Sequence, residues 1–155
     1  MGFSVSASTA IIFIAAFVSV GILYTSAYNG YEQVSGATMA AHEDSLDQQN
    51  TAINITSVTH NASASPDYVN VTVENTGSTT LSVEDTDVLL NGSYQATYVS
   101  RTVSTDSGVV AAGGDGTDLW QPGERLTVSI ARTITEPIHV KIETGTGVAD
   151  TEVVP

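Results

Sequence analysis

The chain of 155 residues contains no cysteine and only four lysine or arginine residues. Without cysteine it has no disulfide framework, no thiolate metal site and no cysteine nucleophile. Seventeen acidic residues give a net charge of −13, and no lysine or arginine precedes Arg101. Because phosphate binding needs clustered lysine and arginine, this balance argues against nucleic acid and against electrostatic docking on anionic lipid.

Charge is also missing from the first 31 residues, none of which carries a charged side chain. Val5 to Tyr24 is long enough to cross about 30 Å of hydrocarbon as a helix. Each aliphatic or phenylalanine residue in it favours insertion by about 0.3 to 0.6 kcal/mol. We therefore predict a retained membrane anchor over residues 1–31. Its anchoring side chains are Ile11, Ile12, Phe13, Ile14, Phe17, Val18, Val20, Ile22 and Leu23.

Two other interpretations of this segment remain open. A cleaved secretory signal would begin with basic residues and end in a small-x-small site, and residues 24–27 form only a weak site of that kind. A buried core helix is the second alternative. For the anchor, we expect a single-pass protein of the cell membrane with a short inner tail and an extracytoplasmic C-terminal domain. Tyr24, Tyr28 and Tyr31 would then lie at the outer interface.

Residues 32–50 predict a helical stalk that continues the anchor and ends near Asn50, because good helix formers predominate and the first proline is Pro66. Apolar positions are too sparse there for a self-sufficient amphipathic face. The stalk is therefore either solvated or packed on a partner.

From residue 51 the pattern changes to the two-residue alternation of strands with one buried face. The clearest strands are expected at residues 53–55, 69–73, 126–130 (with Ile134 keeping the phase) and 138–142. Weaker candidates are residues 81–83, 88–90, 94–99 and 148–153. Seven or eight short strands predict an all-β, immunoglobulin-like antiparallel sandwich over residues 51–155. The main alternative is a pilin-like sheet packed on the stalk helix.

Two further features of this region are predicted. The longest irregular stretch, Thr105 to Asp118, is glycine-rich and reads as a flexible loop, and Trp120 just after it is expected to seal the edge of the core. The alternation places Asn70, Thr72 and Glu74 outward, beside Thr127 and Ser129. This polar surface has few aromatic anchors, so we expect one copy to bind a protein partner weakly and several copies to bind together.

Four N-x-Ser/Thr sequons lie within residues 54–93, at Asn54, Asn61, Asn70 and Asn91. They are candidates for N-glycosylation on an extracytoplasmic face, since Asn54 and Asn70 occupy the outward phase of their strands. Asparagines with an ordinary structural role in strands and turns would produce the same sequence pattern.

No constellation in the sequence predicts catalysis or a cofactor. His42, His60 and His139 are too scattered to suggest a site, and there is no nucleophile elbow, zinc histidine pair or phosphate-binding loop. Asp106, Asp115 and Asp118 could offer oxygens to calcium, but the full ligand pattern is absent. We therefore predict no enzyme and no metal site, with these residues and the cluster of Glu84, Asp85 and Asp87 as solvated acidic groups.

Five segments carry a resemblance to a known family. They are MGFSVSASTAIIFIAAFVSVGILYTSAYNGYEQV, LDQQNTAI, VENTGSTTLSVEDTDVLLNG, DLWQPGE and TGTGVADTE. Together they resemble the FlaF family, accessory proteins of the archaellum in salt-loving archaea. The resemblance spans nearly the whole chain, and its acidity is compatible with high salt, where carboxylates hold hydration while their repulsion is screened.

The resemblance implies a stator component of the archaeal rotary motility filament. It implies one membrane helix and an outer β-sandwich that binds the surface-layer protein and a sister protein, FlaG, within a homo- or hetero-oligomer. The helix is also similar to type IV pilin N-termini, but no basic leader precedes it and position 5 is Val where pilins carry Glu. A pilin-like filament subunit, or archaellin, is the alternative.

Overall fold

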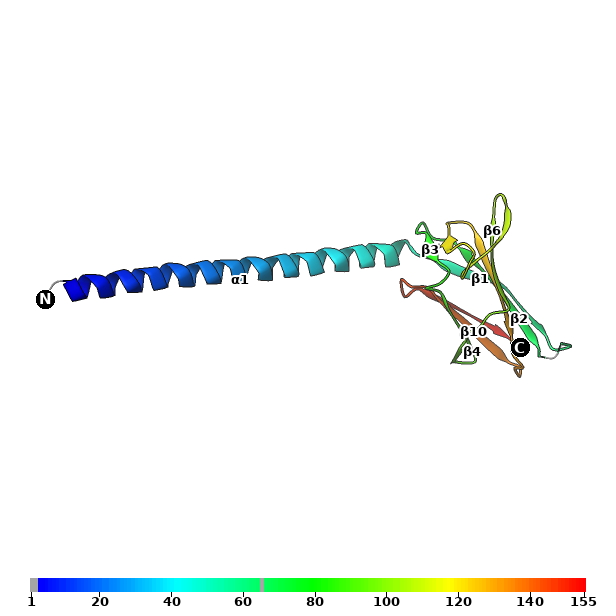
Figure 1. Cartoon of the computed structure of the whole chain (residues 1–155). Coiled ribbons are helices and arrows are strands. Elements are labelled where there is room, and N and C mark those ends of the chain that lie inside the picture. Colours follow the sequence, from blue (N-terminus) through cyan, green and yellow to red (C-terminus); the bar gives the residue numbers. More distant parts are fainter. Residues whose placement is uncertain (1–2, 65) are drawn as a thin grey trace. The chain divides into compact units, whose positions relative to one another are not determined.

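The computed structural model describes residues 3–64 and 66–155, and within them one helix precedes eleven strands (Figure 1). The helix is α1 (Phe3–Asn50). The strands are β1 (Ile53–Asn61), β2 (Tyr68–Asn75), β3 (Leu81–Ser82), β4 (Asp87–Leu90), β5 (Ser93–Tyr94), β6 (Ser100–Thr105), β7 (Gly108–Ala111), β8 (Leu119–Trp120), β9 (Arg125–Ala131), β10 (Ile138–Glu143) and β11 (Ala149–Val154). The chain divides into two compact units, Met1–Glu43 and Asp44–Pro155, so the last residues of α1 belong to the same unit as the strands.

The single helix α1 is 48 residues long and contains no proline. Hydroxyl groups in it donate to the carbonyl four residues earlier, from Ser19 to Ala15 at 2.8 Å and from Thr25 to Gly21 at 3.0 Å. These bonds keep the hydroxyls satisfied without water. The predicted helix through to Asn50 is confirmed, while Met1 and Gly2 of the predicted anchor lie outside the described residues.

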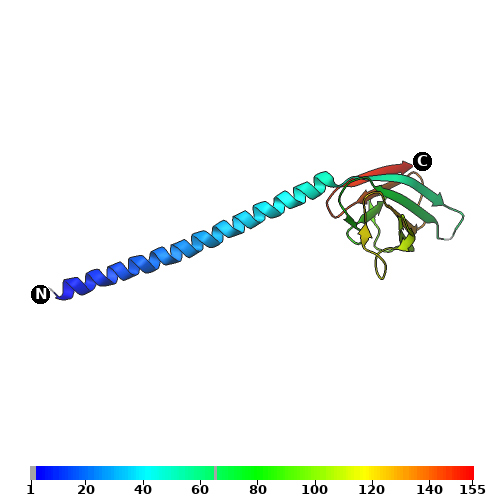
Figure 2. The ribbon, with the colours of Figure 1, turned by 90° about the horizontal axis from the view of Figure 1, so that it is seen from above.

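The strands form an antiparallel two-layer sandwich (Figures 1 and 2). One layer has five strands in the order β1-β2-β9-β6-β7, and the other has four in the order β11-β10-β4-β5. A small two-stranded sheet pairs β3 with β8. The fold class expected from the alternation, an all-β antiparallel domain after one long N-terminal helix, is therefore confirmed.

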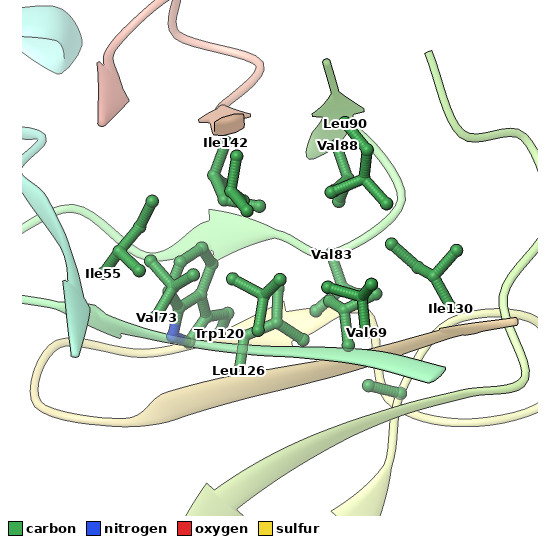
Figure 3. Close-up of a cluster of buried hydrophobic side chains, with 14 of the residues drawn as sticks. Ile55, Val69, Val73, Val83, Val88, Leu90, Trp120, Leu126, Ile130 and Ile142 are labelled. Atoms are coloured by element: carbon green, nitrogen blue, oxygen red, sulfur yellow. The ribbon is translucent and has the colours of Figure 1, made fainter. Parts of the chain in front are cut away.

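Alternation along the strands produces the core between the layers. In β2 the odd-numbered residues Val69, Val71 and Val73 are fully buried while their even-numbered neighbours are half-exposed. Figure 3 shows Ile142, Val88 and Leu90 of one layer pointing toward Leu126, Val69 and Val73 of the other. Trp120 is completely buried among them. It lies in the small sheet of β3 and β8, and its Nε1 donates to the carbonyl of Glu124 at 2.9 Å.

The junction between α1 and β1 is clasped by the turn that follows β2. The N–H groups of Thr76 and Gly77 both donate to the carbonyl of Ala52 at 2.9 Å, and Ser78 N–H donates to the carbonyl of Asn50 at 2.8 Å. A side chain at Gly77 would lie 2.5 Å from the backbone oxygen of Asn50, so only glycine fits this approach. We call these contacts of residues 76–78 with residues 50–52 the clasp.

The structure corrects several sequence-based boundaries. The segment 105–118 is not one irregular loop, because β7 pairs with β6 inside it. The strands β6 and β8 were not predicted, and the candidate at 94–99 reduces to Ser93–Tyr94 in β5. Ile134 lies beyond the end of β9 but still packs against the core. The predicted division at residues 31 and 50 stays a prediction.

Candidate partner-binding surface

The outer face of the five-stranded layer carries three rows of polar side chains that run across the strands. On the central strands β2, β9 and β6 the rows are Asn70–Ser129–Ser100, Thr72–Thr127–Thr102 and Glu74–Arg125–Ser104. On the edge strand β1 they continue to Thr59, Ser57 and Asn54, respectively. We call these twelve positions the hydroxyl face, since eight of them are serine or threonine.

The predicted outward residues therefore do share one surface. Thr72 and Thr127 touch through their hydroxyls at 3.2 Å, and Arg125 forms an ion pair with Glu74 at 2.8 Å. The exposed ion pair contributes little stability but neutralises both charges. The result is a surface with hydrogen-bonding groups, no net charge and no aromatic anchor.

The contribution of β6 to this face was missed from the sequence. Its Ser100, Thr102 and Ser104 occupy alternate positions, with Val103 buried between them. A serine or threonine at every second position around one buried valine is a strand signal of its own. It was not recognised because β6 has a single fully buried apolar residue.

The sequons differ in how the structure presents them. Asn54 is exposed on the hydroxyl face, whereas Asn70 is half-buried on the interior strand β2. Asn61 is exposed at the end of β1, and its Oδ1 accepts a hydrogen bond from the N–H of Ser63 at 3.1 Å. The amide nitrogen Nδ2 of Asn61 points to no described acceptor.

Asn91 occupies the tight turn between β4 and β5, where both it and Gly92 have positive φ (50° and 74°). An Asn-Gly pair suits such a hairpin turn, because both residues tolerate this conformation. The side chain of Asn91 is also used within the fold: Oδ1 accepts from His139 N–H at 2.7 Å and Nδ2 donates to the carbonyl of Thr135 at 3.5 Å. Asn91 is thus a structural turn residue.

Two of the acidic residues, Asp118 and Glu84, accept hydrogen bonds from neighbouring segments. Asp118 Oδ1 accepts from the N–H of Glu84 at 2.7 Å and from the hydroxyl of Ser82 at 3.1 Å. Glu84 Oε1 in turn accepts from Gly114 N–H at 3.1 Å, which fastens the glycine-rich loop. An open hollow of about 540 Å³ is lined in part by Asp47, Glu84, Asp85 and Asp87. Among the described residues, no group of three histidine or acidic side chains could hold a metal ion.

One histidine lies in a cluster that the sequence did not suggest. Nδ1 of His60 is 3.1 Å from Oε1 of Glu136, and its Nε2 is 3.5 Å from Oδ2 of Asp67. The His60 side chain is only 6% exposed. The hydrogen bond to Glu136 raises the pKa of His60; burial of the ring opposes this shift and Asp67 reinforces it. The cluster joins the end of β1 to the loop before β10.

Within the described residues, α1 is the one helix long and apolar enough to cross a membrane, and its most apolar window of 18 residues has a mean hydropathy of 2.2. The predicted anchor residues are exposed, from Val18 at 56% to Phe17 at 76%. Tyr24 and Tyr28 stack beyond them, with ring centroids 6.3 Å apart.

Comparison with known protein families identifies the family of the chain. The model of the family described as archaeal-type flagellin matches residues 2–153. The chain belongs to the archaeal-type flagellin family. This membership makes the chain an archaellum-related protein, as the sequence resemblance implied. No curated protein sequence matches it significantly.

One solved structure similar to this family member is the archaellum periplasmic stator protein FlaG from Sulfolobus acidocaldarius. The two sequences are 21% identical, and the alignment covers 67% of this chain and 99% of the other, with a TM-score of 0.43.

Proposed function

We propose that the chain is a membrane-anchored, stator-type component of the archaellum motor, of the FlaF type. Its α1 residues would anchor it in the cell membrane, and its β-sandwich would stand outside and bind the surface-layer protein and a sister stator protein, FlaG. The role is structural rather than enzymatic: it resists torque during swimming. The observation that carries this proposal is the hydroxyl face, a polar surface on a domain that buries its own core.

The chemistry of the exposed side chains on α1 supports the proposed anchor. The aliphatic and phenylalanine residues between Ile11 and Leu23 are all more than half exposed. In water, this contiguous apolar surface would be unfavourable, whereas at the centre of a bilayer each such residue favours insertion by about 0.3 to 0.6 kcal/mol. The acidic β-sandwich would remain on one side, because charged residues are costly in hydrocarbon.

The hydroxyl face favours weak contacts that are used many times. It offers hydroxyl and amide groups but no buried aromatic or arginine anchor, so a single copy should bind weakly. Anchoring in a membrane holds copies in one plane, which lets several engage one partner lattice together. The combined affinity then exceeds the single-site affinity without any new contact.

A filament subunit is the second candidate, and the family match favours it because the matching model is that of flagellins. In that case the exposed apolar segment of α1 would pack against other subunits instead of lipid. The two candidates differ in where the protein is found. A stator component should stay in the membrane fraction when filaments are sheared off, and a filament subunit should leave with them.

A matched pair of variants tests the role of the hydroxyl face. Thr127→Glu places a carboxylate at the centre of the middle row, between Thr72 and Thr102. Thr151→Glu places the same group on the outer side of the other layer, opposite Lys141. We expect both variants to fractionate with membranes and only Thr127→Glu to lose retention of isolated surface-layer protein.

Other outcomes of that experiment would redirect the assignment. Equal retention by both variants would remove the hydroxyl face as the binding surface. Recovery of the protein in sheared filaments, with none in the membrane, would replace the stator proposal by the filament subunit.

A further inference from the structure

The two layers of the sandwich come together along one side at β1 and β11. Each strand is the edge of its own layer and has a single ladder partner. The carboxylate of Asp150 joins them, since Oδ2 accepts from Ile55 N–H at 2.7 Å and Oδ1 accepts from Thr151 N–H at 2.8 Å. Beyond this bridge the strands enclose a groove of about 380 Å³, with Val58 and Val153 among its lining residues.

The backbone of β1 turns hydrogen-bonding groups toward this groove. In an antiparallel edge strand, N–H and C=O groups of successive residues point alternately toward and away from the partner strand. Ile55 points away from β2, because its N–H bonds to Asp150. The bulge between Ile55 and Ser57 inserts one extra residue into β1 and so shifts the alternation by one position. The next residues whose backbone points away from β2 are therefore Val58 and His60.

The same reasoning applies to β11. The N–H of His139 on β10 points to Asn91, away from β11. The residues on either side of His139 therefore form the backbone hydrogen bonds that join β10 to β11. Val153 lies opposite His139 and thus points its backbone groups away from β10. Both walls of the groove consequently offer peptide donors and acceptors to an added strand.

The side chains that line the groove indicate the chemistry of a segment that could fill it. Val58 and Val154 pack against the core but are only partly buried, so the core is open at this seam. Edge strands are commonly protected by lysine, proline or a covering segment. The groove lining carries no lysine, and Glu152 is its one charged side chain, with the Asp150 carboxylate at its head.

We propose that an extended segment of a different protein adds to this groove as a strand. Its backbone would pair with Val58, His60 and Val153, its apolar side chains would cover Val58 and Val154, and a lysine or arginine would face Glu152. Among the described strands, those at the sheet edges carry no lysine or arginine, so a second copy of this chain has no edge strand with the required charge. Arg101, Arg125 and Lys141 lie on interior strands, and Arg132 directly follows one.

The proposal is independent of the hydroxyl face, which lies on the outer side of one layer. It is tested with the full chain in detergent micelles and two short synthetic peptides. One peptide alternates valine with lysine and threonine, and the other has glutamate in place of lysine. We expect the basic peptide to bind, measured by fluorescence anisotropy, and to slow amide hydrogen exchange at Val58 and His60.

Two matched variants separate this groove from other strand edges. Val153→Lys places an ammonium group at the groove, at a residue that is 48% exposed, and should weaken binding of the basic peptide at least about tenfold. Val109→Lys makes the same change on β7, the opposite edge of the five-stranded layer, at a residue that is 68% exposed, and should leave binding unchanged. Thermal unfolding verifies that both variants fold.

Several results would overturn the proposal. They are failure of the basic peptide to bind the unaltered chain, equal binding of the acidic peptide, and equal losses in the two variants. A dimer of the chain that Val153→Lys dissociates would assign the groove to a second copy instead.

Discussion

Replacing Asn75 by alanine should destabilise the β-sandwich strongly, because this fully buried amide binds three backbone groups at the end of β2. Its Nδ2 donates to the carbonyls of Thr79 at 2.9 Å and Trp120 at 3.1 Å, and its Oδ1 accepts from Gly77 N–H at 3.1 Å. Gly77 N–H retains a second acceptor, the carbonyl of Ala52. Alanine therefore leaves two carbonyls without their partner, at about 1 to 2 kcal/mol each, for a loss of roughly 2–4 kcal/mol.

The assay is urea unfolding of the full chain in detergent micelles, followed by tryptophan fluorescence. Trp120 is the sole tryptophan and is completely buried, so its emission reports on the β-sandwich alone. Asn75→Asp should lose at least as much stability, because a carboxylate cannot donate to the two carbonyls. Asn70→Ala, on the half-exposed side of the same strand, should change stability by less than about 0.5 kcal/mol. A loss below about 1 kcal/mol for Asn75→Ala would refute the reasoning.

Three further predictions concern the membrane, pH and glycosylation. Phe17→Arg should cost about 2.5 to 3.5 kcal/mol of insertion and release the protein from carbonate-washed membranes, whereas Met39→Arg should not; retention of both would contradict the anchor. The pKa of His60 is raised in the folded state, so protonated His60 should stabilise the domain relative to the variant His60→Gln. This stabilisation should be full below about pH 6.5 and should decline as pH rises through the folded pKa. Urea unfolding of both proteins across this range should show a difference in the free energy of unfolding that depends on pH. Intact mass should reveal a glycan that Asn61→Gln removes, and none that depends on Asn91, whose amide is hydrogen-bonded in its turn; the reverse pattern would count against this reading.

The regular elements were predictable where one physical signal dominated. The helix α1 follows from the absence of proline and charge over its first half, and β2, β9 and β10 each alternate buried and outward residues along their whole length. The hairpin of β6 and β7 was not predictable in this way. All of β7 is exposed, and β6 has only Val103 fully buried, so tertiary pairing rather than apolar pattern defines both strands.

For the candidate surface, the sequence predicted which residues of a strand point outward, but not which of these residues lie side by side on neighbouring strands. Alternation placed Asn70 and Thr72 outward, but their row partners depend on which strands pair and in which register. The cluster of His60 with Asp67 and Glu136 was not recognised for the same reason, since Glu136 is 76 residues away in the chain. Long-range register is set by packing of the whole domain and leaves little trace in local spacing.

The clasp has a mechanical consequence for the domain. Tension along α1 enters the sandwich at residues 50–52, where the carbonyls of Asn50 and Ala52 accept hydrogen bonds from the N–H groups of residues 76–78. Part of the load is thereby diverted from the edge strand β1 to the end of β2, an interior strand. From there Asn75, whose Nδ2 donates to the carbonyl of Trp120, passes it to this fully buried residue. Rupture under load should therefore begin with failure of the core around Trp120, and not with peeling of β1 from its sheet.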